Sequence, residues 1–426
     1  MLDLTVAALS PETWPFGLEW LPEDTCLVGG AVRDGLLQRQ RDYLDLDFVL
    51  PEKAVETARQ IARFYQAGFV VLDAGRQIAR VVFEKATADF AQQEGETLQI
   101  DLKRRDFTIN AIAYNPFTRT LIDPLDGCQD LQRQLIRMVS AQNLADDPLR
   151  LLRAYRQASQ LGFSLDRETQ ETLIALAPKL GQVAAERVRM ELGYLLNLRS
   201  GSEALEKAWK DGVLTGWFPH TCAERVTQVH QVDEIVQEFG DRWPPLWEHF
   251  NRPILASQPT NGISLAKLIL FIAPEIEKAE DELKALKLSR AEIRAAIAVL
   301  QRLPDILHPE QMSLRDQYFF FNAIRLVFPT LILLARVKGV DIEAIAPLCD
   351  RYLNPEDPVV YPQPLLGGNT LIAALNLPKG KLIGQLLTEI QIAQIEGKVT
   401  TEAEAIDFAQ RWLKPVQPNI ARSARE

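Results

Sequence analysis

One short segment, residues 44–50, constrains the fold of this 426-residue chain more than any other. It reads Leu-Asp-Leu-Asp-Phe-Val-Leu, and this alternation of apolar and acidic residues is typical of a β-strand with one buried face. Successive side chains of a strand point to opposite faces, so we expect the apolar residues on a buried face. Asp45 and Asp47 are then predicted to lie together on the opposite face.

Two glycines, Gly29 and Gly30, lie between a short apolar segment and a predicted helix that runs from Ala31 to about Gln38. Glycine lets the backbone approach a phosphate group closely, and the positive end of a helix attracts anions. Arg33 adds a positive charge. Neither Gly-x-Gly-x-x-Gly nor a Gly-Lys-Ser/Thr sequence occurs here, which excludes a dinucleotide fingerprint and a Walker loop. A Gly-Gly pair alone is usually a turn, but followed by a helix and the acidic strand it indicates a phosphate-binding site.

Two carboxylates on one strand face repel each other, and both stay ionised near a partly buried surface only if a cation neutralises them. Mg²⁺ prefers hard oxygen ligands, usually one or two carboxylates together with phosphate oxygens. An isolated Asp-x-Asp is more often a solvated strand face. Beside the predicted phosphate site, however, we predict that Asp45 and Asp47 are catalytic residues and ligands of Mg²⁺.

Two further segments carry charged residues in a distinctive order. Residues 101–111 read DLKRRDFTINA, and residues 146–156 read DDPLRLLRAYR. Together with the segments above, they resemble the class II nucleotidyltransferases. This family contains the bacterial tRNA CCA-adding enzymes, their CC-adding and A-adding specialists, and the bacterial poly(A) polymerases. The resemblance extends from about Cys26 to Leu192.

The resemblance implies an α+β nucleotidyltransferase head of the polymerase-beta-like type with a mixed β-sheet, followed by an elongated all-α neck, body and tail. We place the catalytic head at residues 1–139 and the neck, with its base-selecting and RNA-binding helices, at residues 140–200. A helical body is expected at residues 201–353 and a helical tail at residues 354–426. Beyond residue 150, apolar residues at three-and-four spacing agree with a helical remainder.

The resemblance also implies which residues bind the nucleotide. These residues are Gly29, Gly30, Arg33, Arg105, Asp147, Arg150, Arg153 and Arg156. Helical spacing makes Asp147 and Arg150 neighbours, whereas Arg156 is expected to point nearly opposite Asp147. In an alternative interpretation, Pro148 begins the helix and Asp147 only caps it.

The pair Asp147 and Arg150 matches the residues that read the Watson-Crick edge of the incoming base in the family. A carboxylate accepts a hydrogen bond from the amino group that cytosine and adenine share, and a guanidinium donates to a ring nitrogen or a carbonyl oxygen. Uracil and guanine carry a carbonyl group where cytosine and adenine carry the amino group. The resemblance therefore implies selection of C and A without a nucleic-acid template.

The connection between the acidic strand and the basic cluster at residues 103–105 is short. Family members that complete the whole CCA end carry a longer flexible segment there, and its shortening resembles the CC-adding specialists. Asp89, within this connection, is either a third carboxylate that faces the metal or a solvated aspartate at the end of a strand.

The implied function is template-independent addition of C, and of A as well if the protein makes the whole CCA end, from CTP and ATP to the 3′ end of tRNA, with release of pyrophosphate. The short connection favours C-only addition, with a separate A-adding enzyme acting in sequence. An A-adding enzyme and a bacterial poly(A) polymerase are alternatives with the same chemistry. A catalytically silent tRNA-binding protein is an alternative of a different class.

Composition is compatible with this function but does not indicate it. The net charge of −10 disfavours an RNA partner overall, and residues 101–160 are only mildly basic, with nine Lys or Arg against seven Asp or Glu. The four cysteines form no Cys-x-x-Cys motif, which excludes a typical zinc site or disulfide framework. No apolar run is long enough to span a bilayer, and we expect a cytoplasmic protein.

Overall fold

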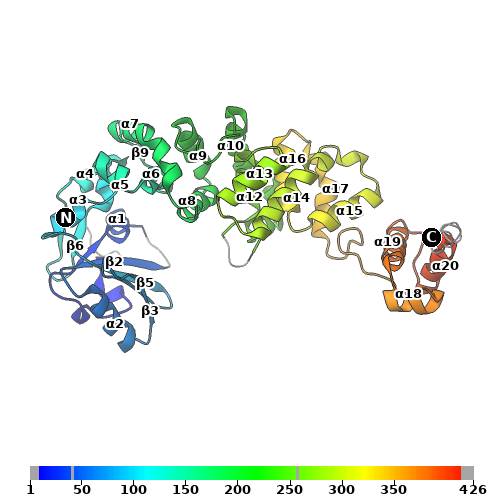
Figure 1. Cartoon of the computed structure of the whole chain (residues 1–426), viewed down its shortest axis with the longest axis horizontal. Coiled ribbons are helices and arrows are strands. Elements are labelled where there is room, and N and C mark those ends of the chain that lie inside the picture. Colours follow the sequence, from blue (N-terminus) through cyan, green and yellow to red (C-terminus); the bar gives the residue numbers. More distant parts are fainter. Residues whose placement is uncertain (1–8, 40–42, 256–258, 414–426) are drawn as a thin grey trace, which may run out of the picture. The chain divides into compact units, whose positions relative to one another are not determined.

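The computed structural model describes residues 9–39, 43–255 and 259–413 (Figure 1). The chain divides into two compact units, Met1–Pro219 and His220–Glu426. All the predicted site residues belong to the first unit. The first residues of the predicted head, 1–8, and the last residues of the predicted tail, 414–426, lie outside the described ranges.

The first unit begins with a seven-stranded mixed sheet in the order β3-β4-β5-β2-β1-β6-β7. Its strands are β1 (Cys26–Val28), β2 (Leu44–Leu50), β3 (Gly68–Asp73), β4 (Ile78–Val82), β5 (Ala86–Gln92), β6 (Ala113–Asn115) and β7 (Thr120–Ile122). β2 pairs with β5 in parallel, and all other neighbouring pairs in this sheet are antiparallel. This arrangement confirms the predicted mixed sheet.

The central strand β2 separates two faces as its alternation predicts. Leu46, Phe48 and Leu50 are buried on one face, where Phe48 stacks on Phe90 of β5 with ring centroids 5.3 Å apart. Helix α2 (Ala54–Phe64) packs against β4 and β5. On the other face, Val49 lies in a hydrophobic cluster with Leu102 of α3 (Leu98–Lys103). The aspartates of β2 share the face of Val49, nearer the start of the strand, where it is less buried.

Helix α1 (Gly30–Leu36) follows β1, so it begins one residue before the predicted start and ends two residues before the predicted end. Its N-cap is Gly29, with φ 70° and ψ −133°. A side chain at this position would be strained, because L-residues rarely adopt these angles. The glycine turn therefore places the N-terminus of α1 beside β2, in agreement with the contacts between α1 and β2.

The links between β2 and α3 are all short, as the sequence predicts. They comprise residues 51–53, 65–67, 74–77, 83–85 and 93–97. No long loop interrupts residues 51–97, all of which the structure describes. The expectation for Asp89 was wrong in one respect, because it lies in the middle of β5, paired in register with Asp47, and not at a strand end.

Helices form most of the remainder of the first unit. They are α4 (Gly127–Arg133), α5 (Ala141–Asp146), α6 (Leu149–Leu161), α7 (Arg167–Leu176), α8 (Ala185–Asn197) and α9 (Gly201–Lys210), with a small sheet of β8 (Leu135–Ile136) and β9 (Ser164–Leu165). α6 packs against both α8 and α9. α9 thus belongs with the neck helices in the first unit, although we placed the start of the body at residue 201. The four-part division stays a prediction.

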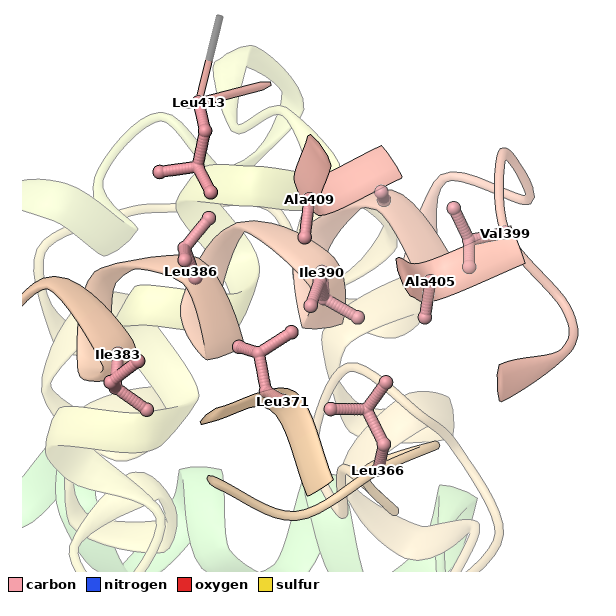
Figure 2. Close-up of a cluster of buried hydrophobic side chains, with 10 residues drawn as sticks. Leu366, Leu371, Ile383, Leu386, Ile390, Val399, Ala405, Ala409 and Leu413 are labelled. Carbon is pink, nitrogen blue, oxygen red and sulfur yellow. The ribbon is translucent and has the colours of Figure 1, made fainter. Parts of the chain in front are cut away.

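The second unit is helical throughout its described residues, as predicted. It comprises α10 (Ala223–Arg242), α11 (Leu246–Asn251), α12 (Gly262–Phe271), α13 (Ile276–Ala285), α14 (Arg290–Ile306), α15 (Leu314–Ile324), α16 (Phe328–Val337), α17 (Ile342–Leu353), α18 (Gly368–Leu375), α19 (Lys381–Ile395) and α20 (Glu402–Leu413). The last three helices enclose their own hydrophobic cluster, in which Leu371, Leu386 and Ile390 face Ala405 and Ala409 (Figure 2). Small residues on α20 let the two longer helices approach closely.

No helix among the described residues is by itself long and apolar enough to cross a membrane. α15 and α16 reach the required length and composition only as a pair, and they meet at an angle of 113°. Nearly all of α16 is buried inside the unit, as expected for a core helix.

Candidate active site

A cavity of about 510 Å³ opens over the acidic face of β2. Its lining includes five arginines and five carboxylates, so that it can hold both a cation and an anionic substrate. Of the predicted site residues, it brings together Gly29, Gly30, Arg33, Asp45, Asp47, Arg105, Arg153 and Arg156. Asp147 and Arg150 do not line it.

Asp45 and Asp47 differ in their surroundings. Asp45 is exposed and accepts a hydrogen bond of 2.6 Å from the hydroxyl of Thr87. Burial, followed by the negative charges of Asp45 and Asp89, raises the pKa of Asp47 to about 7, against the opposing effect of Arg105 and Arg80. A carboxyl group with so little compensation fits a site completed by a cation.

The donor set fits a divalent cation that keeps ligands from water and substrate. Across residues 9–39, 43–255 and 259–413, no group of three or more His, Cys, Asp or Glu side chains could hold a metal ion. Two aspartates are nevertheless sufficient protein ligands for Mg²⁺, which is commonly bound by one or two carboxylates together with phosphates. Asp45 and Asp47 would hold the ion.

Asp89 is already paired with an arginine. Its carboxylate accepts two hydrogen bonds from Arg80 of β4, at 2.6 and 2.7 Å. The sequence interpretation missed Arg80 because the pairing depends on the register of β4 with β5. Alternation within β4 could only have shown that Arg80 shares a face with the aspartates.

Gly29 lies between two charged side chains. A Cβ atom at this position would approach Nη1 of Arg105 to 3.3 Å and Oδ2 of Asp47 to 3.4 Å. Nε of Arg105 is buried and has no hydrogen-bond partner in the described structure. Arg105 is also held through its backbone, because the side-chain amide of Asn143 donates 2.8 Å hydrogen bonds to the carbonyl oxygens of Lys103 and Arg105. The positively charged group is thus fixed close to the acidic pair.

Arg33 is buried in a polar network that sequence reasoning did not identify. Its guanidinium donates to Asp34 at 2.9 Å and to the amide oxygen of Asn110 at 2.8 Å. The amide nitrogen of Asn110 donates to Asp106 and to Gln157, each at 2.9 Å. Asp106 and Asn110 belong to the segment 101–111 already recognised as a motif, and Gln157 directly follows the segment 146–156, but neither segment shows that these side chains meet.

Asp106 connects this network to α6. Its carboxylate accepts two hydrogen bonds from Arg153, from Nε at 3.0 Å and from Nη2 at 2.8 Å. Burial tends to raise the pKa of this carboxyl, but the charge and hydrogen bonds of Arg153 and Asn110 outweigh it and lower the pKa to about 2. Arg153 is therefore a partner of Asp106 as well as a residue of the cavity wall.

Arg156 continues the wall from α6 towards α8. It pairs with the carboxylate of Glu191 and donates a 2.6 Å hydrogen bond to Gln160. Arg156 lines the cavity and Asp147 does not, in line with their expected opposite directions. The helical spacing favoured Arg153 over Arg156 as a site residue, but the cavity does not distinguish them.

Asp147 and Arg150 lie at the junction of α5 and α6. The capping interpretation of Asp147 is wrong, because the N-cap of α6 is Pro148 and no carboxylate caps the helix. Asp147 pairs with Arg187 of α8 at 3.1 Å and lies 3.8 Å from Nε of Arg150. Oδ1 of Asp147 is buried without a hydrogen-bond partner in the described structure. Asp147 and Arg150 therefore do contact each other, as predicted, and Oδ1 of Asp147 can still accept a hydrogen bond.

Comparisons with known proteins show the family of the chain. The family model of the poly A polymerase head domain matches residues 25–137. A model for the RNA- and SrmB-binding site of polymerase A matches residues 162–224, and a model of tRNA nucleotidyltransferase domain 2 matches residues 261–409. The mixed sheet and the matching head-domain model together define a nucleotidyltransferase with a polymerase-beta-like head.

Similarity to whole proteins is more specific. The chain is 48% identical to the CC-adding tRNA nucleotidyltransferase of Synechocystis sp., over 94% of this chain and 96% of that protein. It is 32% identical to the A-adding tRNA nucleotidyltransferase of Deinococcus radiodurans, over 92% and 96% of the two chains. The Thermotoga maritima CCA-adding enzyme, solved in complex with tRNA, has the same fold, with a TM-score of 0.68, 24% identity and coverage of 92% and 91%. This chain belongs to the tRNA nucleotidyltransferase family, whose members use a divalent metal ion.

Proposed function

We propose that the protein adds cytidine nucleotides from CTP to the 3′ end of tRNA without a nucleic-acid template, as the first part of CCA-end synthesis. The observation that carries this proposal is the 48% identity to a CC-adding relative over almost the whole of both chains. The short links between β2 and α3 support C-only addition, since we associate a longer segment there with the switch to A.

The reaction is nucleotidyl transfer at the acidic face of β2. The terminal ribose hydroxyl gives up its proton to water and attacks the α-phosphorus of CTP, the bond from that phosphorus to the bridging oxygen breaks, and pyrophosphate leaves. Asp45 and Asp47 would hold Mg²⁺, which would lower the pKa of the attacking hydroxyl and offset the charge of the triphosphate. Asp47 has the greater need of the cation, because it is only partly exposed and lies beside two other carboxylates.

Phosphate binding belongs to the glycine turn and to Arg105. The backbone of Gly29 and Gly30 begins α1 at the cavity, where the helix N-terminus favours an anion. Arg105 has a buried Nε without a partner, and this donor is free for a phosphate or ribose oxygen. Arg33 already donates to Asp34 and Asn110, so it contributes positive charge from a fixed position.

Base selection belongs to Asp147 and Arg150. The unused Oδ1 of Asp147 accepts a hydrogen bond from the amino group of cytosine. Arg150 donates a hydrogen bond to the neighbouring ring nitrogen or carbonyl oxygen. Because Arg150 is tied by one nitrogen to the carbonyl oxygen of Arg104 at 2.8 Å, its remaining donors are held in one orientation. A fixed donor and acceptor pair discriminates better than a mobile one.

The proposal is tested by transfer of labelled CTP and ATP, separately and together, to tRNA that ends at the discriminator base and to tRNA that ends in CC. Incorporation of two C residues and no A is the expected result. Addition of A to tRNA ending in CC would contradict the C-only subtype, and an open-ended A product would identify a poly(A) polymerase. Absence of pyrophosphate release would identify a silent RNA-binding protein.

A C-only enzyme requires a separate A-adding enzyme that acts on its product. Such a partner is defined by its substrate, a tRNA that ends in CC. Both reactions belong to the compartment that holds tRNA precursors, CTP and ATP, and we place this protein in the cytoplasm.

A further inference from the structure

Two exposed apolar side chains line the catalytic cavity from α8. Met190 and Tyr194 have 56% and 51% of their surface exposed, and they lie four residues apart on one face of the helix. The rest of the lining is predominantly charged or polar. Large apolar groups left open to solvent inside a polar site indicate contact with an apolar part of a ligand.

The ring of Tyr194 is supported from one side. The guanidinium of Arg156 lies over the ring at 5.5 Å from its centroid, a cation–π contact. Arg156 is itself held by the carboxylate of Glu191 and by Gln160. This support restricts the movement of the ring and leaves about half of the side-chain surface open to a planar group, such as a nucleobase.

The incoming base cannot occupy this position if Asp147 and Arg150 select it, a premise that rests on the proposed function. Arg150 and Arg156 are six residues apart on α6, which separates them by about 9 Å along the helix axis. A base that forms hydrogen bonds with Arg150 through its edge cannot also lie beside Arg156. The position next to Tyr194 is therefore a different one from that at Asp147 and Arg150, which do not line the cavity, and the other nucleotide of the reaction is the terminal nucleotide of the acceptor.

We propose that Tyr194 stacks on the terminal base of the acceptor RNA, with Met190 at the edge of the same base. The chemistry of the acceptor fits this assignment, because its terminal base changes from the discriminator base to C as the reaction proceeds. Stacking tolerates every base, since each has a π-face, whereas hydrogen bonding to base edges does not. Tyr194 is a substrate-positioning residue that holds the attacking ribose over Asp45 and Asp47.

The test is a thermodynamic cycle between Tyr194 and the acceptor base. Dissociation constants are measured for tRNA ending at the discriminator base and for the same tRNA with an abasic terminal ribose, using the wild-type protein and Tyr194→Ala. The wild type is expected to bind the abasic tRNA roughly fivefold to a hundredfold more weakly. Tyr194→Ala is expected to bind both tRNAs equally, at the weaker affinity, and Tyr194→Phe is expected to restore the difference.

Phe64→Ala provides a matched control, because Phe64 is 63% exposed and lies outside the cavity. It should leave the difference in affinity between the two tRNAs unchanged. The inference would be overturned if Tyr194→Ala kept the full difference in dissociation constant between the two tRNAs. It would also be overturned if the substitution raised the KM for CTP and left the KM for tRNA unchanged. Failure of the wild type to incorporate C would instead contradict the proposed function, so the two failures are distinguishable.

Discussion

Gly29 leaves little room for a side chain beside the acidic pair. Its backbone has a φ of 70°, and an added Cβ would lie within 3.4 Å of both Arg105 and Asp47. Gly29→Ala is therefore expected to destabilise the protein by about 1 to 3 kcal/mol, measured by denaturant unfolding. Gly30→Ala is the matched control, because its nearest neighbour would be Nη2 of Arg33 at an ordinary 3.6 Å. Equal stability losses in the two variants would contradict this account.

Asp45 is the exposed member of the predicted metal pair. Removing its carboxylate in Asp45→Ala should reduce C transfer by roughly 10³-fold or more, since metal-assisted charge stabilisation is worth several kcal/mol. Binding of tRNA should change little, which a filter-binding assay can measure. Asp89→Asn serves for comparison, because Arg80 already holds that carboxylate, and it should have a much smaller effect on transfer. Retained transfer in Asp45→Ala would exclude the two-carboxylate site.

At the scale of elements, Asp106 joins the loop after α3 to helix α6 through Arg153. Its pKa is about 2 in the folded protein, below the ordinary value of 3.8, so folding favours the ionised form. The resulting stability, on the order of 2 kcal/mol, is present above about pH 4 and is lost as the pH falls towards 2. Urea unfolding should show Asp106→Asn to be less stable than the wild type at pH 7.

The pH dependence distinguishes this ion pair from a loss of packing. The difference in unfolding free energy between the wild type and Asp106→Asn should shrink between about pH 5 and pH 3, because the unfolded wild-type chain, in which this carboxyl has its ordinary pKa of 3.8, takes up a proton there while the folded protein stays ionised. A difference that is constant over this range would show that Asp106 acts by shape alone. Asp101→Asn offers a comparison in the same segment, since Asp101 pairs with Arg104 and Arg105 outside α6.

At the scale of the whole molecule, the net charge of −10 opposes a polyanionic substrate. Binding of tRNA must therefore depend on local groups of Lys and Arg that contact phosphates, and such contacts release counterions. Raising the salt from about 50 to about 200 mM should increase the KM for tRNA by at least roughly tenfold and the KM for CTP by much less. Equal salt dependence for both substrates would place the phosphate contacts in the catalytic cavity alone.

Local patterns predicted the parts of this molecule that depend on neighbouring residues in sequence. Alternation along residues 44–50 was sufficient for the two faces of β2, since side-chain direction in a strand is set by the backbone. The glycine turn and α1 could also be predicted locally, because glycine tolerates a positive φ and a helix follows directly in the sequence. The contact between Asp147 and Arg150 also came from helical spacing, although its additional partner, Arg187, lies 40 residues further along the chain.

The sequence by itself determined the order of elements, the acidic strand, the glycine turn and the family to which the chain belongs, because each depends on residues close together or on a recognisable motif. Only the tertiary structure decided that Arg80 forms an ion pair with Asp89, that Asp106 forms one with Arg153, and that Tyr194 lines the catalytic cavity. These contacts depend on strand register and helix packing between distant segments. Side-chain pairing across such distances is chosen by burial and electrostatics in the folded chain, and no local pattern encodes it.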